Sequence, residues 1–190
     1  KMEIVLLGLA WIVYFFIHSF LATNVVKLYV EKRIPALFAY YRISYNLIAM
    51  AGLIPLLYGS IFLPDPLLFA SAWLVPLGIF LLITGLVLLY LAFKAFDGAE
   101  FLGLKKETKP ELVFTGMYQY VRHPLYFATI VLILGLFLLV PTQKMLLVLL
   151  ISYGYILIGY RLEERKLVEV FGDKYLDYQK RVKAIIPRLY

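Results

Sequence analysis

The sequence predicts an all-α fold, a polytopic membrane helical bundle with about five transmembrane helices. Hydrophobic residues make up 63% of the 190-residue chain, whereas soluble domains contain closer to half. These residues are gathered into runs, and the charged residues lie mainly between the runs. The length fits one domain over residues 1–190, with a three-helix part at 1–93 and a connection, a helical hairpin and a tail at 94–190.

Five apolar segments mark the expected spans, at residues 4 to about 21, 45–63, about 71–93, 125–140 and 145–160. A spanning helix needs about 20 residues, which the first three segments supply, although Pro55 interrupts the second. The last two segments have 16 residues each and are joined by the short "PTQK", which predicts a helical hairpin. Because such helices are shorter than the roughly 30 Å hydrocarbon core, the ends away from the turn should lie within the bilayer boundary or under protein.

The positions of lysine and arginine predict the orientation in the membrane. All of the 19 basic residues except Lys1 and Lys144 fall in the stretches 24–42, 94–122 and 161–188. Positive loops face the cytoplasm, so the N-terminus is expected outside and the C-terminus inside, which agrees with an odd number of spans. The first segment has no strongly basic stretch before it and no small-residue cleavage site, so we expect a span rather than a cleaved signal.

Several function classes are excluded by composition. The chain has no cysteine, which excludes disulfides, thiolate metal ligands and a cysteine nucleophile. Its two histidines, His18 and His123, form no recognised metal-ligand spacing, and we expect no metal. The basic residues are juxtamembrane and do not resemble a nucleic-acid surface, so the expected partner is the lipid bilayer and not nucleic acid.

The stretch "YVRHPLYFAT" places polar side chains at one end of the predicted hairpin. Pro124 suits the first turn of a helix, whose positive dipole end together with Arg122 could hold a carboxylate. The other end carries Glu163 and Glu164, of which one is expected to face inward because neighbouring helical residues point about 100° apart. A cationic end beside an anionic end would match a zwitterionic ligand. An interhelical salt bridge that closes the hairpin is the alternative.

A second polar group is expected at the same membrane level, contributed by the first two segments. His18 and Ser19 lie near the end of the first segment, and Arg42, Tyr45 and Asn46 share one face at the start of the second. These residues could join the helices by hydrogen bonds. As a group in one layer, they could instead form a second wall of the same cavity.

The connection and the tail both have patterns of ordered structure. Aromatic residues in the long connection 94–120 argue against disorder, and Gly116 is one of its glycines that permit turns. In the tail, one apolar stripe falls at helical spacing: Leu167, Phe171, Tyr175, Tyr178 and Val182. Gly172 is expected to break the run and Asp173 to cap a second helix. The tail is either an amphipathic helix on the lipid surface or a lid, and the apolar "AIIPRL" favours the lid.

Taken together, "ELVFTGMYQYVRHPLY" and "EERKLVEVFGDKYLDYQKRVKAIIPRL" resemble the integral membrane methyltransferase superfamily. That superfamily includes isoprenylcysteine carboxyl methyltransferases and phospholipid methyltransferases. The shared elements are an LVxxGxYxxVRHPxY segment, an EE pair after the hairpin, an FGxxYxxY segment and a late proline, over about residues 111–189. In the first half, "HSFLAT", "YYRISYN" and "FDGAEFLGLKK" resemble a bacterial branch with NnrU-like, nurim-like and methanethiol S-methyltransferase proteins.

The resemblance implies methyl transfer from S-adenosylmethionine (SAM), bound at the cytoplasmic end of the hairpin under the tail. It implies a cofactor site formed by the following residues: Gly116, Tyr118, His123, Tyr126 and one of Glu163 or Glu164. Arg122 matches a family arginine that serves the cofactor or the substrate. A lipophilic or small membrane-permeant acceptor would present a carboxylate, an amine or a thiol, and Tyr45 or His18 could help an amine or thiol to lose its proton. The expected location is a bacterial or archaeal inner membrane.

Two other functions fit parts of the pattern. Membrane sterol reductases, which use NADPH, share a related C-terminal arrangement, but their motif resembles RHPNYxxE. Here Phe127 and Ala128 follow Tyr126, so this class fits less well. A non-catalytic membrane protein of the nurim type is the other alternative.

Overall fold

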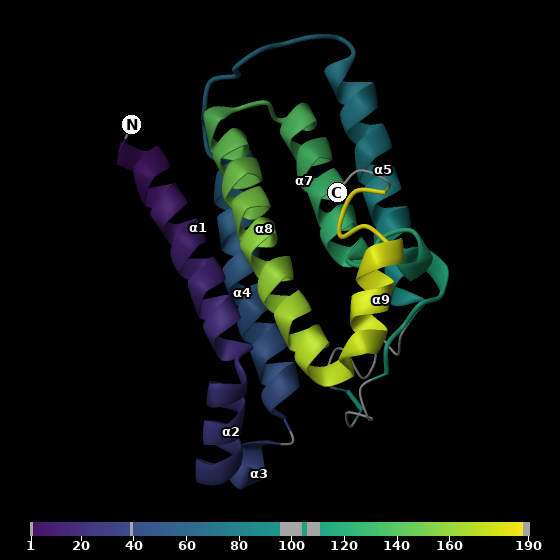
Figure 1. The fold of residues 1–190 in the computed structure, drawn as a ribbon. Helices are drawn as coiled ribbons and strands as arrows, with labels where there is room; N and C mark the ends of the chain where they lie inside the picture. The colour runs from purple at the N-terminus through teal and green to yellow at the C-terminus, as the bar shows by residue number, and fades with distance from the viewer. Residues whose placement is uncertain (1, 39, 96–103, 106–110, 188–190) are drawn as a thin grey trace. The chain divides into compact units, whose positions relative to one another are not determined.

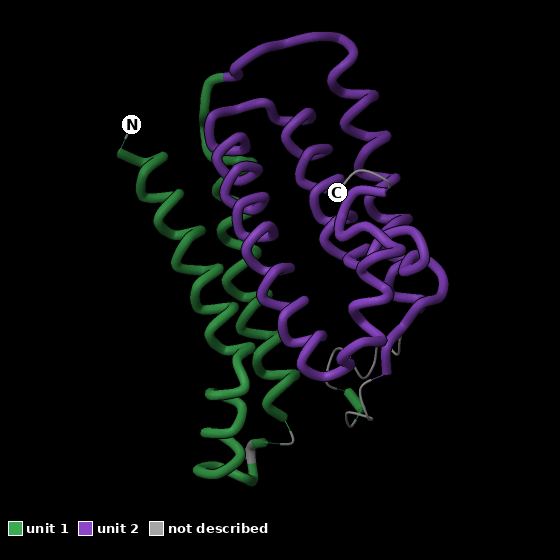
Figure 2. Tube along the Cα trace, in the orientation of Figure 1, with its two compact units in different colours: residues 1–66, 98–108 green, residues 67–97, 109–190 purple. Residues whose placement is uncertain are grey.

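The structure of the chain is a computed structural model that describes residues 2–38, 40–95, 104–105 and 111–187. The described residues are mainly helical, and their β pairing consists of two isolated bridges. The predicted all-α fold is therefore confirmed. The chain divides into two compact units, residues 1–66 with 98–108 and residues 67–97 with 109–190 (Figure 2). The third apolar segment accordingly belongs to the same unit as the hairpin.

The described residues of the first unit form four helices: α1 (Met2–Leu21), α2 (Asn24–Arg33), α3 (Pro35–Phe38) and α4 (Tyr41–Phe62). Helix α1 packs on α4 through Trp11, which is 2% exposed and donates its indole N–H to Ser60 Oγ at 3.1 Å. The expectation that Pro55 interrupts the second span was wrong, since α4 continues through this proline. In membranes, neighbouring helices and local adjustments satisfy the backbone groups that a proline frees.

The second unit contains α5 (Leu74–Phe93), the 3₁₀ helix η1 (Gly116–Gln119), α7 (Pro124–Leu139), α8 (Gln143–Phe171) and α9 (Asp173–Arg181). Helix α7 lies between α5 and α8 (Figure 1). The α5–α7 contact is close because both helices present glycine. A Cβ atom built at Gly135 would lie 3.0 Å from the carbonyl oxygen of Gly78 and from Leu82 N. Glycine therefore sets the backbone approach of these helices, which is typical of membrane interfaces.

Within the described residues, four helices are long and apolar enough to cross a membrane, namely α1, α4, α5 and α8, and α7 is a shorter apolar helix of 16 residues. The chain is thus an integral membrane protein with nearly the expected set of spans. Helix α8 has 29 residues and continues past Tyr160, so the fifth apolar segment and the helical start of the tail form one helix, a continuity that was not predicted. Hydropathy marks where a helix stops being apolar, whereas Arg, Leu, Glu and Lys all continue a helix well.

Gly172 ends α8 with a φ of +55°, as the break expected at this position requires. The cap expected at Asp173 was wrong, since Gly172 occupies the N-cap position and Asp173 lies in the first turn of α9. After α9, the chain returns to the start of α7. This return makes the short α7 a part of the site described next.

Candidate functional site

The C-terminal segment pairs with the residues that lead into α7. Val121 and Lys183 form a parallel bridge, with Arg122 N donating to Lys183 O at 2.9 Å and His123 N donating to Ala184 O at 2.9 Å. Ala184 and Ile185 are buried in a cluster with Ile156 and Tyr160 of α8. The tail therefore folds back onto protein, which favours the lid over the surface-helix interpretation.

His123 lies between the two glutamates and is 5% exposed. Its Nε2 is 3.2 Å from Glu164 Oε1, and its Nδ1 is 3.6 Å from Glu163 Oε2. One imidazole therefore offers a nitrogen to each of the two carboxylates. The ring also stacks on Tyr126, with centroids 5.4 Å apart. Pro124 at the first helical position holds the preceding histidine out of the helix, with φ −123°.

Glu164 is the centre of a dense polar cluster. Its Oε1 accepts from Arg122 Nε at 2.7 Å, and Arg122 Nη2 lies 2.5 Å from the same oxygen. Tyr175 Oη donates to Oε1 at 3.4 Å, and Gln179 Nε2 donates to Oε2 at 3.1 Å. Only 14% of the Glu164 side chain is exposed. The alternative of a salt bridge that closes the hairpin is thus observed for this glutamate.

Glu163 has a more open position. Among the described residues, its carboxylate accepts a hydrogen bond from Tyr126 Oη at 2.9 Å and faces His123 Nδ1. Its side chain is 47% exposed. Tyr118 lies close enough for the charge of Glu163 to act with burial in raising the pKa of its phenol. Gly116 has a φ of +60°, which favours glycine and shapes the turn before Tyr118.

The pKa of His123 is raised above its ordinary value. Burial alone would lower it, but hydrogen bonds from the ring to Glu163 and Glu164 and the negative charge of both outweigh burial. Protonated His123 then donates a hydrogen bond to Glu164 and forms an ion pair with Glu163. Because the folded-state pKa exceeds the unfolded one, this stabilisation is complete below the unfolded pKa of about 6.5 and is lost as pH rises through the folded pKa.

We therefore expect the melting temperature of the ligand-free protein in detergent to fall as pH increases from 6 to 9. Substituting His123→Gln should flatten this slope, since glutamine keeps a hydrogen-bond donor but does not titrate. Melting curves of both proteins across this range measure the effect. Parallel slopes for the two proteins would contradict a protonated histidine at this position.

His18 and Tyr45 belong to the first unit, where they contact each other. The hydroxyl of Tyr45 is 3.0 Å from His18 Nε2, and the two rings stack with centroids 5.2 Å apart. The ring of Tyr14 also stacks on His18, with centroids 6.0 Å apart. The structure thus brings these two expected catalytic residues together, and their relation to the cluster around His123 stays a prediction. Within the connection, Phe96, Asp97 and Phe101 lie outside the described residues.

Sequence reasoning missed Gln179 as a member of the site and missed the backbone partners of Arg122. Arg122 Nη1 donates to Gln179 O at 3.2 Å and to Val182 O. Tyr178 donates its hydroxyl to Tyr118 O. The tyrosines of the FGxxYxxY segment were a usable signal, since Tyr175 and Tyr178 fall on one face of α9 and are buried.

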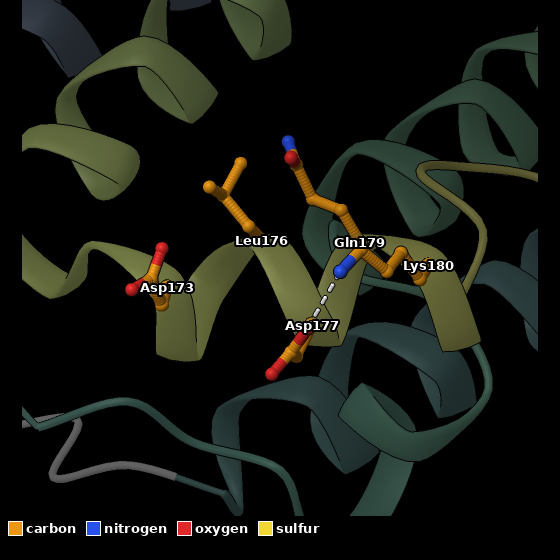
Figure 3. A pocket seen from close by; sticks show the side chains of 5 residues that line it. All are labelled: Asp173, Leu176, Asp177, Gln179 and Lys180. Atoms are coloured by element: carbon orange, nitrogen blue, oxygen red, sulfur yellow. Dashed lines mark hydrogen bonds and ion pairs between the residues drawn. The ribbon is translucent and has the colours of Figure 1, made fainter.

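A concavity on the surface of α9 is lined by residues of that helix alone: Asp173, Leu176, Asp177, Gln179 and Lys180 (Figure 3). Asp177 and Lys180 form an exposed ion pair at 2.8 Å, which contributes little energy. Gln179 is the residue that this concavity shares with the cluster around Glu164. In the part of the chain that the structure describes, no group of three potential ligands could hold a metal ion.

Parts of the chain are similar to known proteins. Residues 69–174 match the family model of phospholipid methyltransferase. Methanethiol S-methyltransferase 1 of Bradyrhizobium diazoefficiens is 39% identical over 44% of this chain and 28% of its own length. Methanethiol S-methyltransferase of Crocosphaera subtropica is 35% identical over 63% of this chain and 45% of its own length.

A more distant similarity covers more of the chain. Protein-S-isoprenylcysteine O-methyltransferase of Xenopus laevis is 28% identical over 76% of this chain and 51% of its own length. The chain therefore spans about half or less of the length of these curated relatives. No solved structure matches the chain significantly.

Proposed function

The chain belongs to the phospholipid methyltransferase family, and we propose that it transfers a methyl group from SAM to a small or lipophilic acceptor. The observation that carries the proposal is the cluster of His123, Tyr126 and the two glutamates beneath the folded-back tail. Transfer takes place at the cytoplasmic leaflet of a bacterial or archaeal inner membrane. Supporting this side is the concentration of lysine and arginine in the loops next to the cluster.

The residues present fit part of SAM well. The half-exposed carboxylate of Glu163 suits the ammonium group of the cofactor, since a charged donor and acceptor form the stronger kind of hydrogen bond. The ring of Tyr126, which stacks on His123, offers an aromatic face to a sulfonium. Arg122 fits less well as a clamp for the carboxylate of SAM, because its guanidinium already binds Glu164 and two backbone carbonyls.

SAM would supply a methyl group that its sulfonium already activates, so the chain has mainly to align and to dehydrate the reactants. The buried tail residues Ala184 and Ile185 exclude water beside Tyr160. His123, held between two carboxylates, fixes the wall against which the cofactor lies. Tyr45 and His18 remain the proposed groups that assist a thiol or an amine in losing its proton.

A small thiol is the first acceptor to test. Curated relatives with 34–44% identity are methanethiol S-methyltransferases. A lipophilic carboxylate is the second, because the protein-S-isoprenylcysteine O-methyltransferase of Xenopus laevis matches at lower identity but over 76% of the chain. Labelled SAM, incubated with each acceptor and the protein in lipid vesicles, distinguishes the two.

Purified protein in detergent should gain thermal stability on addition of SAM or its demethylated product, and not on addition of NADPH. Stabilisation follows because a ligand that binds only the folded state adds about 2.7 kcal/mol at a hundredfold excess over its Kd. The shift in melting temperature is the measurement. His123→Ala, or glutamine at both Glu163 and Glu164, should abolish the shift in a protein that still folds.

A shift with NADPH alone would support a reductase in place of a methyltransferase. No shift with either cofactor would favour a non-catalytic membrane protein. If the shift with SAM survived both sets of substitutions, the cofactor would bind elsewhere in the chain.

A further inference from the structure

The two adjacent glutamates differ in how completely the protein satisfies them. Glu164 faces Arg122, His123, Tyr175 and Gln179, and 14% of its side chain is exposed. Among the described residues, Glu163 accepts one hydrogen bond, from Tyr126, and pairs with His123 at 3.6 Å, and 47% of its side chain is exposed. A carboxylate has about four acceptor positions, so Glu164 has little capacity for another donor, whereas Glu163 keeps an accessible one.

Arg122 is similarly committed to the protein. Its Nε and Nη2 bind Glu164, and its Nη1 binds the carbonyl oxygens of Gln179 and Val182 at the end of α9. A cation at the C-terminal end of a helix is favoured by the dipole and satisfies carbonyls that the helix leaves open. Arg122 therefore joins three parts of the second unit, namely the start of α7, the C-terminal part of α8 and the end of α9.

The consequence of this junction is the position of the C-terminal segment. The backbone N–H groups of Arg122 and His123 donate to Lys183 and Ala184. Ala184 and Ile185 are then buried against α8. Arg122, Glu164 and Gln179 therefore hold the tail where it covers His123. We call these three residues the tail latch.

We infer that the two glutamates have separate tasks: Glu163, with Tyr126, binds the cationic ammonium of the cofactor, while Glu164 acts with Arg122 and Gln179 as the tail latch. Arg122 and Glu164 are then positioning residues that seat the tail and do not touch the cofactor. The assignment of Glu163 rests on the proposed use of SAM. The assignment of the tail latch depends on contacts within the protein alone.

The matched variants Glu163→Gln and Glu164→Gln separate the two tasks, since each removes one charge and keeps nearly the same shape. Two quantities are measured for each protein in detergent: the Kd for SAM, by calorimetry, and hydrogen exchange of the Arg122 and His123 amides. Those amides donate to the tail, so their exchange reports its seating directly.

Glu163→Gln should weaken SAM binding about tenfold to a hundredfold, the value of a charge-assisted hydrogen bond, and leave amide exchange unchanged. Glu164→Gln should accelerate exchange of both amides without any ligand. Saturating SAM should restore part of their protection, because the cofactor and the seated tail stabilise each other. If Glu164 only stabilised the fold and the seated tail did not affect cofactor binding, saturating SAM would not restore protection of these amides.

Three further variants keep the test decisive if Glu164→Gln does not fold. Gln179→Met removes one hydrogen bond of the tail latch and should accelerate exchange to a smaller extent. Arg122→Met should lose amide protection because it removes both the charge and the donors. Arg122→Lys keeps the charge but lacks the fork of donors, so its amides should be protected more than in Arg122→Met and less than in the unmodified protein.

Unchanged exchange in Glu164→Gln, Gln179→Met and Arg122→Met would overturn the tail latch. Equal loss of SAM affinity and equal exchange in the two glutamine variants would overturn the division of tasks. If the unmodified chain binds no SAM, the proposed function and the task of Glu163 both fail. The exchange measurements would then decide the tail latch by themselves.

Discussion

Replacing Gly135 by leucine should destabilise the second unit by at least about 3 kcal/mol, the upper part of the range for overpacked cores. Already the first added carbon would lie 3.0 Å from two backbone atoms of α5, Gly78 O and Leu82 N. Backbone atoms inside a helix cannot move aside as the end of a flexible side chain can. Insertion of a side chain must therefore separate α7 from α5, and thermal unfolding in detergent measures the cost.

Gly154→Leu is the matched control for this substitution. Gly154 also lies inside a helix of the second unit, but no other atom lies within 4 Å of a Cβ built at this position. Both variants exchange glycine for a better helix former, so the difference between them isolates the α5–α7 contact. Similar melting temperatures for Gly135→Leu and Gly154→Leu would contradict the close approach of the two helices.

The effect should extend to the site, because α7 begins directly after His123. If α7 moves away from α5, its first turn carries His123 and Tyr126 with it. We expect Gly135→Leu, where it still folds, to lose SAM-dependent stabilisation as well. Gly154→Leu should keep this stabilisation.

How far the sequence predicts the structure depends on which force places each element. The apolar runs placed α1, α4, α5 and α7 within a few residues, because the bilayer imposes their length and composition. The helical spacing in the tail and the break at Gly172 were predicted, but not that the tail continues the fifth span as one helix, since hydropathy ends at Tyr160 while the helix does not. The helices α2 and α3 were missed for a related reason, because charges mark a loop between spans but say little about its local structure.

For the candidate site, the sequence was sufficient to group His123, Tyr126 and the glutamates, but it left open which glutamate faces inward. That question depends on α9 and on the residues that follow it, which bring Gln179 and two carbonyl groups to Arg122. Such contacts join residues about 60 positions apart in the chain, and no helical periodicity predicts them. Arg122 consequently looked available for a ligand, although the folded protein uses it internally.

The second large effect is expected in the tail, for the substitution Ile185→Ala. Ile185 is 1% exposed and packs in a cluster with Ile156, Tyr160 and Ala184. Truncation of a buried isoleucine to alanine costs about 2–5 kcal/mol, from the lost burial and from the cavity that remains. Thermal unfolding should show this loss, and the tail should also leave the start of α7 more often.

Ile186→Ala provides the neighbouring control, because Ile186 is 37% exposed and its truncation should change stability by less than about 0.5 kcal/mol. A surface helix lying on lipid would give a different pattern, in which neither substitution affects folding of the second unit. Faster exchange of the Arg122 and His123 amides in Ile185→Ala, but not in Ile186→Ala, would show that buried apolar contacts and the tail latch hold the same segment. Equal effects of the two substitutions on stability and exchange would contradict the folded-back tail, and with it the covered site that the proposed methyl transfer requires.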